Sequence, residues 1–511
     1  MKKIFYLFSF VLLLSSCSSE QSDLKNYIPA EAKSVLMINN KTIVSEIKWD
    51  VLFGKGKLEF KMLNNILLKT LAENPLEAGI SLNDKSFVFT TDSAVCALLP
   101  LSSPDDLSSF LSSNNLPLKE EDGFSFIKKD ESITLLKDGM LAILWGAYDE
   151  KSAAAFVDKI QNSSTPKLII SKAHSLEAID SDSHLAFYGE DNPLFSTLTS
   201  AAKGLVTTPA QKGKVGELVA FFNFKNGKLE AKTKQYYESN SAAIKAYQKT
   251  SGIAKMMAGV NVDNAILNAG VSLDLMPFLM AQENEGTKHL LDSLLSLYAG
   301  ASSEMIASVV EGDFFLSFNK LNVVMGEKVI KTEEEQNDEE NIDFVEGPSI
   351  LPDFNAAFTL KDTVLGRMGL VRALMDFAPS VQNSVYYFSS ARSYMFFKGY
   401  NVYFTSDTSI IRKVMNATPT DVNASLHNFS NALQLNFKEL SKKLPVQFFP
   451  QIVPFISVFE KNLNYLSYSV QPPKGNVLEG DFVIEGSNKE ENILLSIIKM
   501  SNELNGATTL P

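Results

Sequence analysis

Residues 94–106 read AVCALLPLSSPDD, and this stretch holds two secondary-structure elements with a clear boundary between them. The apolar run Val95–Leu99 is typical of a buried β-strand. Ser103 is a good helix cap, Pro104 suits the first helical position, and the two aspartates that follow favour the first turn. The stretch therefore predicts a strand that leads directly into a helix.

Three more strands and a second helix follow this pair. The strands are predicted at Phe124–Ile127, Ile133–Leu136 and Leu141–Trp145 from their β-branched and aromatic residues. Asp149 is a suitable cap for a helix that carries apolar residues at helical spacing. The order in the first half of the chain is therefore strand, helix, three strands, helix.

The second half of the chain repeats this order. Its strands are predicted at Ala356–Leu360, Val385–Phe388, Tyr394–Phe397 and Val402–Phe404, with helices capped by Asp362 and Asp407. Each half then ends in a hairpin, and the first hairpin turns at Asn226-Gly227. These patterns predict an α+β fold of two similar lobes, 31–258 and 259–511, that arose by internal duplication. Each lobe is expected to pack helices on a mainly antiparallel sheet. A functional cleft between the lobes and simple packing of one lobe on the other both stay open.

The N-terminus is typical of an export signal. Two lysines precede the apolar stretch Ile4–Leu14, which is too short to span a membrane as a helix. Leu14-Ser15-Ser16-Cys17 resembles the lipobox of bacterial lipoproteins, in which the cysteine is alkylated by diacylglycerol. This resemblance predicts a signal peptide at 1–16, lipidation at Cys17 and a lipidated tether at 17–30. A secretory signal with a chance cysteine and an uncleaved anchor are the alternatives.

The charge of the chain limits its partners. Loss of the signal takes two lysines from 47 basic residues and leaves 59 acidic ones, so the mature chain has a formal charge of −14. Such a surface argues against nucleic acid, and against anionic lipid headgroups, as the main partners. The membrane is reached through the lipid on Cys17 instead.

Few residues suggest a chemical site. Cys96 has no partner once Cys17 carries lipid, and its apolar surroundings predict an inert core thiol. Motifs of the HExxH, paired CxxC and EF-hand types are missing from the sequence, and so are GxSxG and the phosphate-binding loop. Three SxxK matches are what chance provides. No catalytic residue, metal ligand or cofactor is therefore predicted, and core or surface roles are expected for the four histidines, His174, His184, His289 and His427.

Two further segments have unusual composition. The acidic run Glu333–Glu340 predicts a solvated loop at 333–341, with a cation or partner site as the alternative. The apolar stretch Leu444–Phe459 contains three prolines and predicts a buried helix and turn. A membrane dip or the lining of an apolar pocket is the alternative for this stretch.

One known family resembles this chain. The motif Ile28-Pro29-Ala30-Glu31-Ala32, the strand with an asparagine that follows it, and the length are similar to those of uncharacterised Bacteroidetes lipoproteins, domain of unknown function 4836. The resemblance implies an envelope lipoprotein and brings no catalytic residues. Ser18 stands where an inner-membrane retention signal has Asp, and acids follow closely. This favours the outer membrane, with either face open.

Three functions are compatible with the sequence. The first is a non-enzymatic envelope lipoprotein that binds a protein partner, which the lack of a catalytic motif favours. The second is a carrier of a lipid or another apolar ligand, suggested by 35 phenylalanines and the stretch Leu444–Phe459. The third is a hydrolase with an unrecognised site.

Overall fold

A computed structural model describes most of residues 24–507. Outside the described residues lie both termini, several breaks of one to three residues, and the segments 48–69, 162–171, 191–215, 278–301, 331–342 and 419–430. Contacts between Cα atoms divide the chain into unit 1, Met1–Glu238 with Asn488–Thr509, and unit 2, Ser239–Ser487 with Leu510–Pro511. Among the described helices, none has the length and apolar character needed to cross a membrane.

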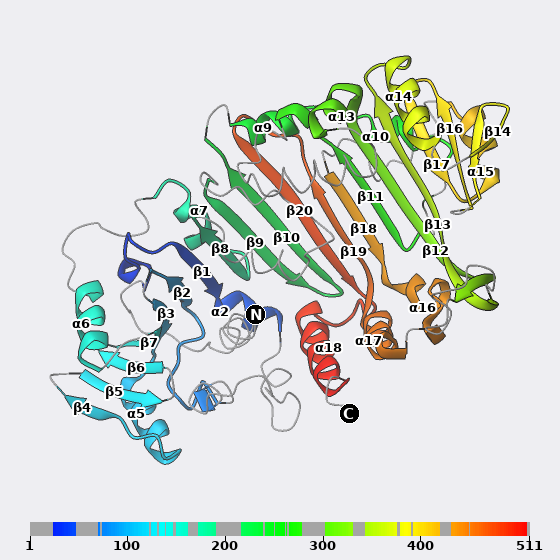
Figure 1. The fold of residues 1–511 in the computed structure, drawn as a ribbon. Coiled ribbons are helices and arrows are strands. Elements are labelled where there is room, and N and C mark those ends of the chain that lie inside the picture. Colours follow the sequence, from blue (N-terminus) through cyan, green and yellow to red (C-terminus); the bar gives the residue numbers. More distant parts are fainter. Residues whose placement is uncertain are drawn as a thin grey trace, which may run out of the picture. The chain divides into compact units, whose positions relative to one another are not determined.

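Unit 1 is an antiparallel sheet with helices (Figure 1). Its strands are β1 (Ser34–Asn39), β2 (Lys85–Thr90), β3 (Ala94–Pro100), β4 (Lys119–Glu121), β5 (Phe124–Lys129), β6 (Ser132–Lys137), β7 (Met140–Gly146), β8 (Leu185–Gly189), β9 (Leu218–Lys225) and β10 (Lys228–Tyr236). Its helices are η1 (Leu24–Tyr27), α2 (Asn40–Glu46), α5 (Pro104–Ser113), α6 (Glu150–Gln161), α7 (Ser175–Ile179) and α18 (Ile493–Ala507). The strand order across the sheet is β4-β5-β6-β7-β3-β2-β1-β8-β9-β10.

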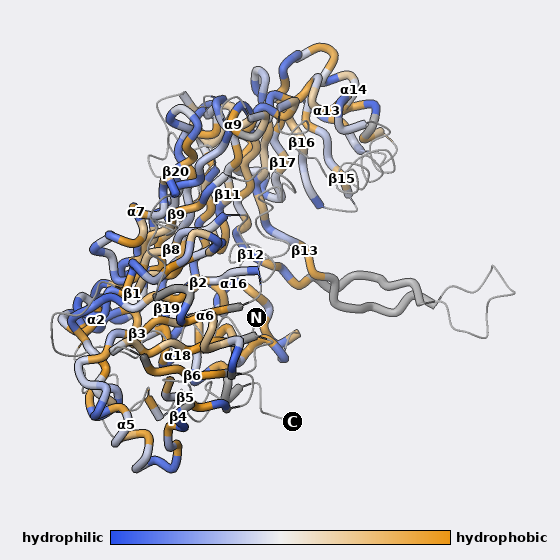
Figure 2. Tube along the Cα trace, turned by 90° about the vertical axis from the view of Figure 1, so that its left-hand side faces the viewer, coloured by the Kyte–Doolittle hydropathy of each residue, from blue (hydrophilic) through white to orange (hydrophobic). Residues whose placement is uncertain are grey.

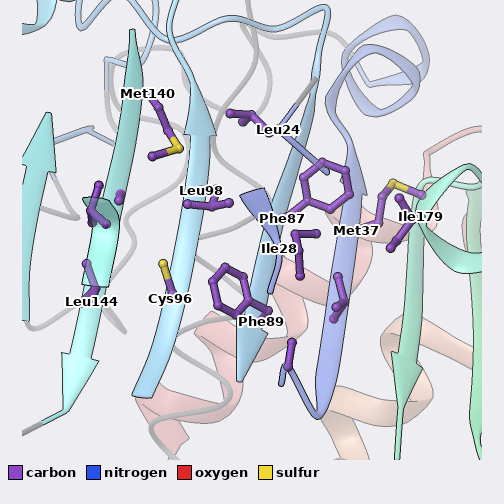
Figure 3. Packing of buried hydrophobic residues seen from close by; sticks show 14 of the residues in the cluster. Leu24, Ile28, Met37, Phe87, Phe89, Cys96, Leu98, Met140, Leu144 and Ile179 are labelled. Atoms are coloured by element: carbon purple, nitrogen blue, oxygen red, sulfur yellow. The ribbon is translucent and has the colours of Figure 1, made fainter. Parts of the chain in front are cut away.

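One large core cluster of unit 1 lies on one face of this sheet. Figure 3 shows Phe89 of β2 beside Cys96 of β3, and Phe87 belongs to the same cluster farther along β2. All three are at most 1% exposed. Leu24 and Ile28 pack into the same cluster and are 6% and 0% exposed. Because these two residues belong to the core, the tether predicted at 17–30 does not extend to residue 30. Residues 24–30 are part of the folded unit.

Unit 2 is also an antiparallel sheet with helices. Its strands are β11 (Leu267–Ser272), β12 (Val310–Ile330), β13 (Asp343–Leu360), β14 (Ser380–Gln382), β15 (Val385–Phe388), β16 (Ser393–Lys398), β17 (Asn401–Thr405), β18 (Asn431–Asn436), β19 (Leu463–Val470) and β20 (Val477–Gly486). Its helices are α9 (Ala242–Tyr247), α10 (Ile253–Met256), α13 (Ser303–Val309), α14 (Leu365–Leu374), α15 (Thr408–Asn416), η6 (Phe437–Glu439), α16 (Leu440–Lys443), η7 (Val446–Phe448), η8 (Pro450–Ile452) and α17 (Val453–Asn462). The strand order is β14-β15-β16-β17-β13-β12-β11-β18-β19-β20.

The two sheets therefore have the same connectivity. Each strand of unit 1 has its counterpart in unit 2 ten strands later, so β1 corresponds to β11 and β8 to β18. Two pairs of helices correspond in the same way. In each unit a helix connects the third strand to the fourth (α5 and α14), and another helix lies between the seventh strand and the eighth (α6 and α15). The α+β class and the antiparallel pairing predicted from the sequence are confirmed.

The helices at the ends of the two halves do not stay with the sheets that precede them. Helix α9 follows β10 but belongs to unit 2, where Asp274 N donates to Ala246 O at 2.8 Å. Helix α18 follows β20 but belongs to unit 1, where the Asn492 side chain donates to Phe224 O at 2.8 Å. The units consequently differ from the predicted lobes 31–258 and 259–511, because each terminal helix packs on the sheet of the other half.

Unit 2 is held on one face by α10 and α15. Ile253 and Met256 of α10 are 1% and 0% exposed and share a cluster with Phe315 of β12. A Cβ atom on Gly270 of β11 would lie 3.1 Å from the Ile253 side chain, so the glycine permits this close approach. In Figure 2 the strands that line the cores carry long hydrophobic stretches.

The apolar stretch Leu444–Phe459 forms short helical turns and most of α17, with Ile456 buried. The helix and turn predicted there are thus present, but the predicted burial is wrong, because most of the described side chains are half-buried or exposed. The acidic run Glu333–Glu340 lies outside the described residues.

Candidate functional site

A cluster of titratable side chains in unit 1 surrounds Glu177 of α7. Its carboxylate accepts hydrogen bonds from Lys234 Nζ at 2.6 Å and from Tyr236 Oη at 2.5 Å, and lies 3.3 Å from His174 Nδ1. The His174 ring stacks on the Tyr236 ring with centroids 3.5 Å apart. Partial burial acts to raise the pKa of Glu177, but the hydrogen bonds from Lys234 and Tyr236 outweigh it and hold the pKa below its ordinary value.

The cluster continues toward β8 and β9. Tyr188 Oη donates to Glu217 at 2.9 Å, and burial followed by this carboxylate raises the pKa of the phenol well above its usual range. Lys172 Nζ lies 3.0 Å from Glu190 and donates to Ala32 O at 2.7 Å. These hydrogen bonds and ion pairs join the segment around α7 to β8 and β10. The arrangement is that of a structural network.

The predicted histidines have separate places. His174 is in this network, whereas His184 is buried in unit 1 with Nε2 3.0 Å from Glu46 Oε2. His289 and His427 lie outside the described residues. In the portion of the chain that the structure describes, no group of three or more His, Cys, Asp or Glu side chains could hold a metal ion.

A different kind of site comes from comparing corresponding strands of the two units. Every residue of β1 and β8 is buried, so both faces of unit 1 are covered there. In β11 burial alternates strictly, and in β18 only Ala432 is buried. The same position in the sheet is therefore covered on both faces in unit 1 and on one face in unit 2.

The half-exposed face that the described residues of unit 2 leave at β11 and β18 is apolar. Cross-strand pairing aligns one row of side chains over six strands, and each member is half-buried. This row consists of Phe354, Phe318, Leu267, Leu435, Leu466 and Ile484. The adjacent positions on the same face are Leu316, Ala269 and Leu433, then Phe314 and Val271. We call these eleven residues the open face.

Such a composition is unusual for a solvated sheet face. Antiparallel sheets with one free face normally place polar side chains on it. Here the free face carries leucines and phenylalanines, and Phe314 and Leu316 are 36% and 38% exposed. Contiguous apolar surface of this kind marks interaction sites. The open face is the candidate binding site of unit 2.

Sequence reasoning did not find the open face. The segment Asp313–Phe318 reads DFFLSF, in which apolar residues point to both sides of a strand. That is the available signal, but it is shared by strands buried on both faces. Only the arrangement of helices around the sheet decides which face is left free.

The remaining predicted site, Cys17, lies outside the described residues. Residues 1–18 match the family model of the prokaryotic membrane lipoprotein lipid attachment site, and Cys17 is the one cysteine in that range. The chain is therefore a lipid-anchored prokaryotic envelope protein.

Comparison with whole proteins adds little. No curated protein matches the chain. Among solved structures, crystal form I of TP0453 has a TM-score of 0.29 and 9% identity, over 43% of this chain and 80% of that one. The menaquinone-specific isochorismate synthase MenF from Escherichia coli has a TM-score of 0.09 and 11% identity, over 82% of this chain and 86% of that one. These likenesses are too weak to assign a fold family or a function.

Proposed function

We propose that this lipoprotein is a non-enzymatic binding protein whose unit 2 receives a protein partner on the open face. The carrying observation is the alternate burial of β11 beside the complete burial of its counterpart β1. The two units share one connectivity, but among the described residues the strand β1 is buried on both faces whereas its counterpart β11 is half-exposed on one. A partner that covers this face would give unit 2 the burial that unit 1 already has.

A protein fits this face better than a small apolar ligand. Pockets for small ligands are concave and bury 70–90% or more of the ligand surface. The open face is a row that crosses six adjacent strands, and its side chains are themselves already half-buried. A sheet face of this breadth matches the extended apolar core of a protein interface. Carriage of a lipid or another apolar ligand is the second candidate.

The proposal also includes the cellular location of the protein and the evolutionary origin of its two units. We place the protein at the outer membrane, because Ser18 follows the lipidated cysteine and Glu20 and Asp23 stand close behind. The shared strand order supports an internal duplication as the origin of the two units. It is compatible with membership in the Bacteroidetes lipoprotein family that the Ile28–Ala32 motif resembles. On this proposal residues 1–16 are the signal peptide and the tether is 17–23.

Photo-crosslinking in intact cells tests the partner. A photoreactive residue replaces Leu316 of the open face, and a matched one replaces Leu176, which is 42% exposed on α7 of unit 1. We expect a discrete protein adduct from position 316 and none from position 176. Equal crosslinking from both positions, or none from position 316, contradicts the proposal.

Native mass spectrometry of the mature chain separates the two candidates. A clean polypeptide mass, together with the crosslink, supports the binding protein. An adduct of lipid mass that disappears when Leu316 is replaced by lysine favours the carrier.

A further inference from the structure

A second apolar surface of unit 2 is more exposed than the open face. The five most exposed large apolar side chains in the described residues are Met368 (67%), Leu365 (65%), Val364 (64%), Met305 (59%) and Tyr400 (58%). Three of them belong to α14 or its N-cap, one to α13, and one to the turn between β16 and β17. We call these five residues the α14 patch.

Hydrogen bonds hold the parts of the α14 patch together. Lys361 Nζ donates to Ala307 O of α13 at 2.8 Å, which joins α13 to the start of α14. Leu360 N donates to Tyr400 O at 2.8 Å. Arg367 Nη2 donates to Gly399 O at 2.7 Å, beside Tyr400. Figures 1 and 2 accordingly show α13 and α14 side by side, close to β16 and β17.

Helix α14 is apolar on both of its sides. Leu370, Val371 and Leu374 pack inward against a cluster that contains Val402 and Met395. The outward side carries the exposed side chains of Val364, Leu365 and Met368, with Arg372 as the exposed charged residue of the helix. Apolar side chains on both sides of a helix favour a state in which both sides are covered.

We propose that the α14 patch rests on the surface of the phospholipid bilayer to which the lipid anchor holds this protein. The matched lipid attachment site places a bilayer beside the chain. Apolar side chains that enter the membrane interface add binding free energy to that of an acyl anchor. Exposed leucine, methionine and tyrosine side chains are suited to the boundary between headgroups and acyl chains.

Charge supports a lipid occupant at this place. The mature chain is acidic as a whole, but residues 365–375 contain Arg367 and Arg372 and no acidic residue. Arginine beside apolar side chains is the composition of helices that lie in the membrane interface. Helix α14 is therefore a local exception to the acidic charge of the chain, with Glu304 and Asp362 near Met305 and Val364 as the acidic residues of the α14 patch's surroundings.

Vesicle sedimentation with the mature chain tests this contact. The lipid is removed by Cys17→Ser, and phosphatidylcholine vesicles with and without phosphatidylglycerol serve as the probes. The test variant is Leu365→Ser with Met368→Ser. The matched control is Val381→Ser with Met415→Ser, since these residues are 52% and 54% exposed but lie outside the α14 patch.

We expect the chain to bind vesicles, the test variant to partition at least about tenfold more weakly, and the control to bind as the parent does. No vesicle binding by the parent, or equal loss in both double variants, overturns the proposal. Circular dichroism of each variant checks that the fold is kept.

A fluorescent label gives a second readout that does not depend on affinity. Met368→Cys and Met415→Cys are each labelled with an environment-sensitive dye, which is selective because Cys96 is buried. A blue shift with vesicles at position 368 and none at position 415 supports the contact. A shift at neither position, or crosslinking of position 368 to a protein in cells, overturns it.

Discussion

Lys249 Nζ lies 2.7 Å from Oδ2 of Asp313, and this ion pair fixes the segment between α9 and α10 to the sheet of unit 2. Asp313 is 2% exposed, and its other oxygen accepts from Gly252 N at 3.0 Å and from Ser272 Oγ at 2.5 Å. The carboxylate therefore has three partners from two separate segments. Asp313 of β12 therefore joins residues 249–252 to β11.

Replacement of this carboxylate is expected to destabilise unit 2 strongly. Asp313→Asn leaves Lys249, whose side chain is 13% exposed, with only the more distant and more exposed carboxylate of Glu311, at 3.6 Å. The free energy of unfolding should fall by about 3 kcal/mol, because the change removes the buried partner of a mostly buried charge. Urea denaturation measures the change. Lys474→Ala, which breaks the exposed pair with Glu479, is the control and should cost less than about 1 kcal/mol.

The network around Glu177 should make unit 1 sensitive to acid. The pKa of Glu177 is lower in the folded chain than in the unfolded chain, so its interactions add stability above the unfolded pKa of about 4.5. That contribution is lost as the pH falls through the folded pKa. Glu177→Gln should therefore be less stable than the parent at pH 6, and the two should converge as the pH falls below 4. A constant difference between pH 6 and pH 3 would refute this assignment.

Cys96 should be unreactive in the folded protein. Burial raises the pKa of its thiol far above the ordinary value, and the side chain is 0% exposed. In a chain that carries Cys17→Ser, a thiol reagent at pH 8 should label Cys96 only after denaturant is added. Met415→Cys provides an exposed thiol that should react at once. Rapid labelling of Cys96 without denaturant would show that the core of unit 1 opens readily.

Local signals predicted the elements of this fold well. Ser103 Oγ accepts from Asp106 N at 3.1 Å, and Asp407 Oδ1 accepts from Ser409 N at 2.8 Å, as their sequence contexts predicted. Gly227 adopts the positive φ of 64° that its hairpin turn requires. These features depend on neighbours within a few residues, and for that reason the sequence displays them.

Long-range features were beyond the sequence. Helix α18 begins at Ile493, and Asn492 Oδ1 accepts from Leu494 N at 3.0 Å. The residues of this helix do not indicate which of the two sheets it covers. The open face could not be predicted for the same reason. The sequence of an apolar strand such as β12 is the same whether or not a helix lies over it.

Helix α18 follows the strands of unit 2 but packs in unit 1, and this placement leads to a prediction that the sequential lobes 31–258 and 259–511 do not make. Deletion of 488–511 removes α18, whose Ile493 and Leu494 are 0% and 2% exposed in unit 1. Amide hydrogen exchange should then lose protection in β9 and β10, although these strands lie far from the deletion in the sequence.

The milder variant Asn492→Ala covers the case in which the deletion does not fold. It removes the hydrogen bond to Phe224 O and the cap of α18, which together are expected to contribute about 1–2 kcal/mol. Asn488→Ala, which loses an exposed bond to Glu490 N, is the control. Loss of protection in β19 and β20, with β9 and β10 unchanged, would show that α18 stabilises the sheet of unit 2 and would contradict this assignment. Loss of protection in β9 and β10 shows that α18 stabilises the sheet of unit 1, so the stability of unit 1 depends on residues 488–507.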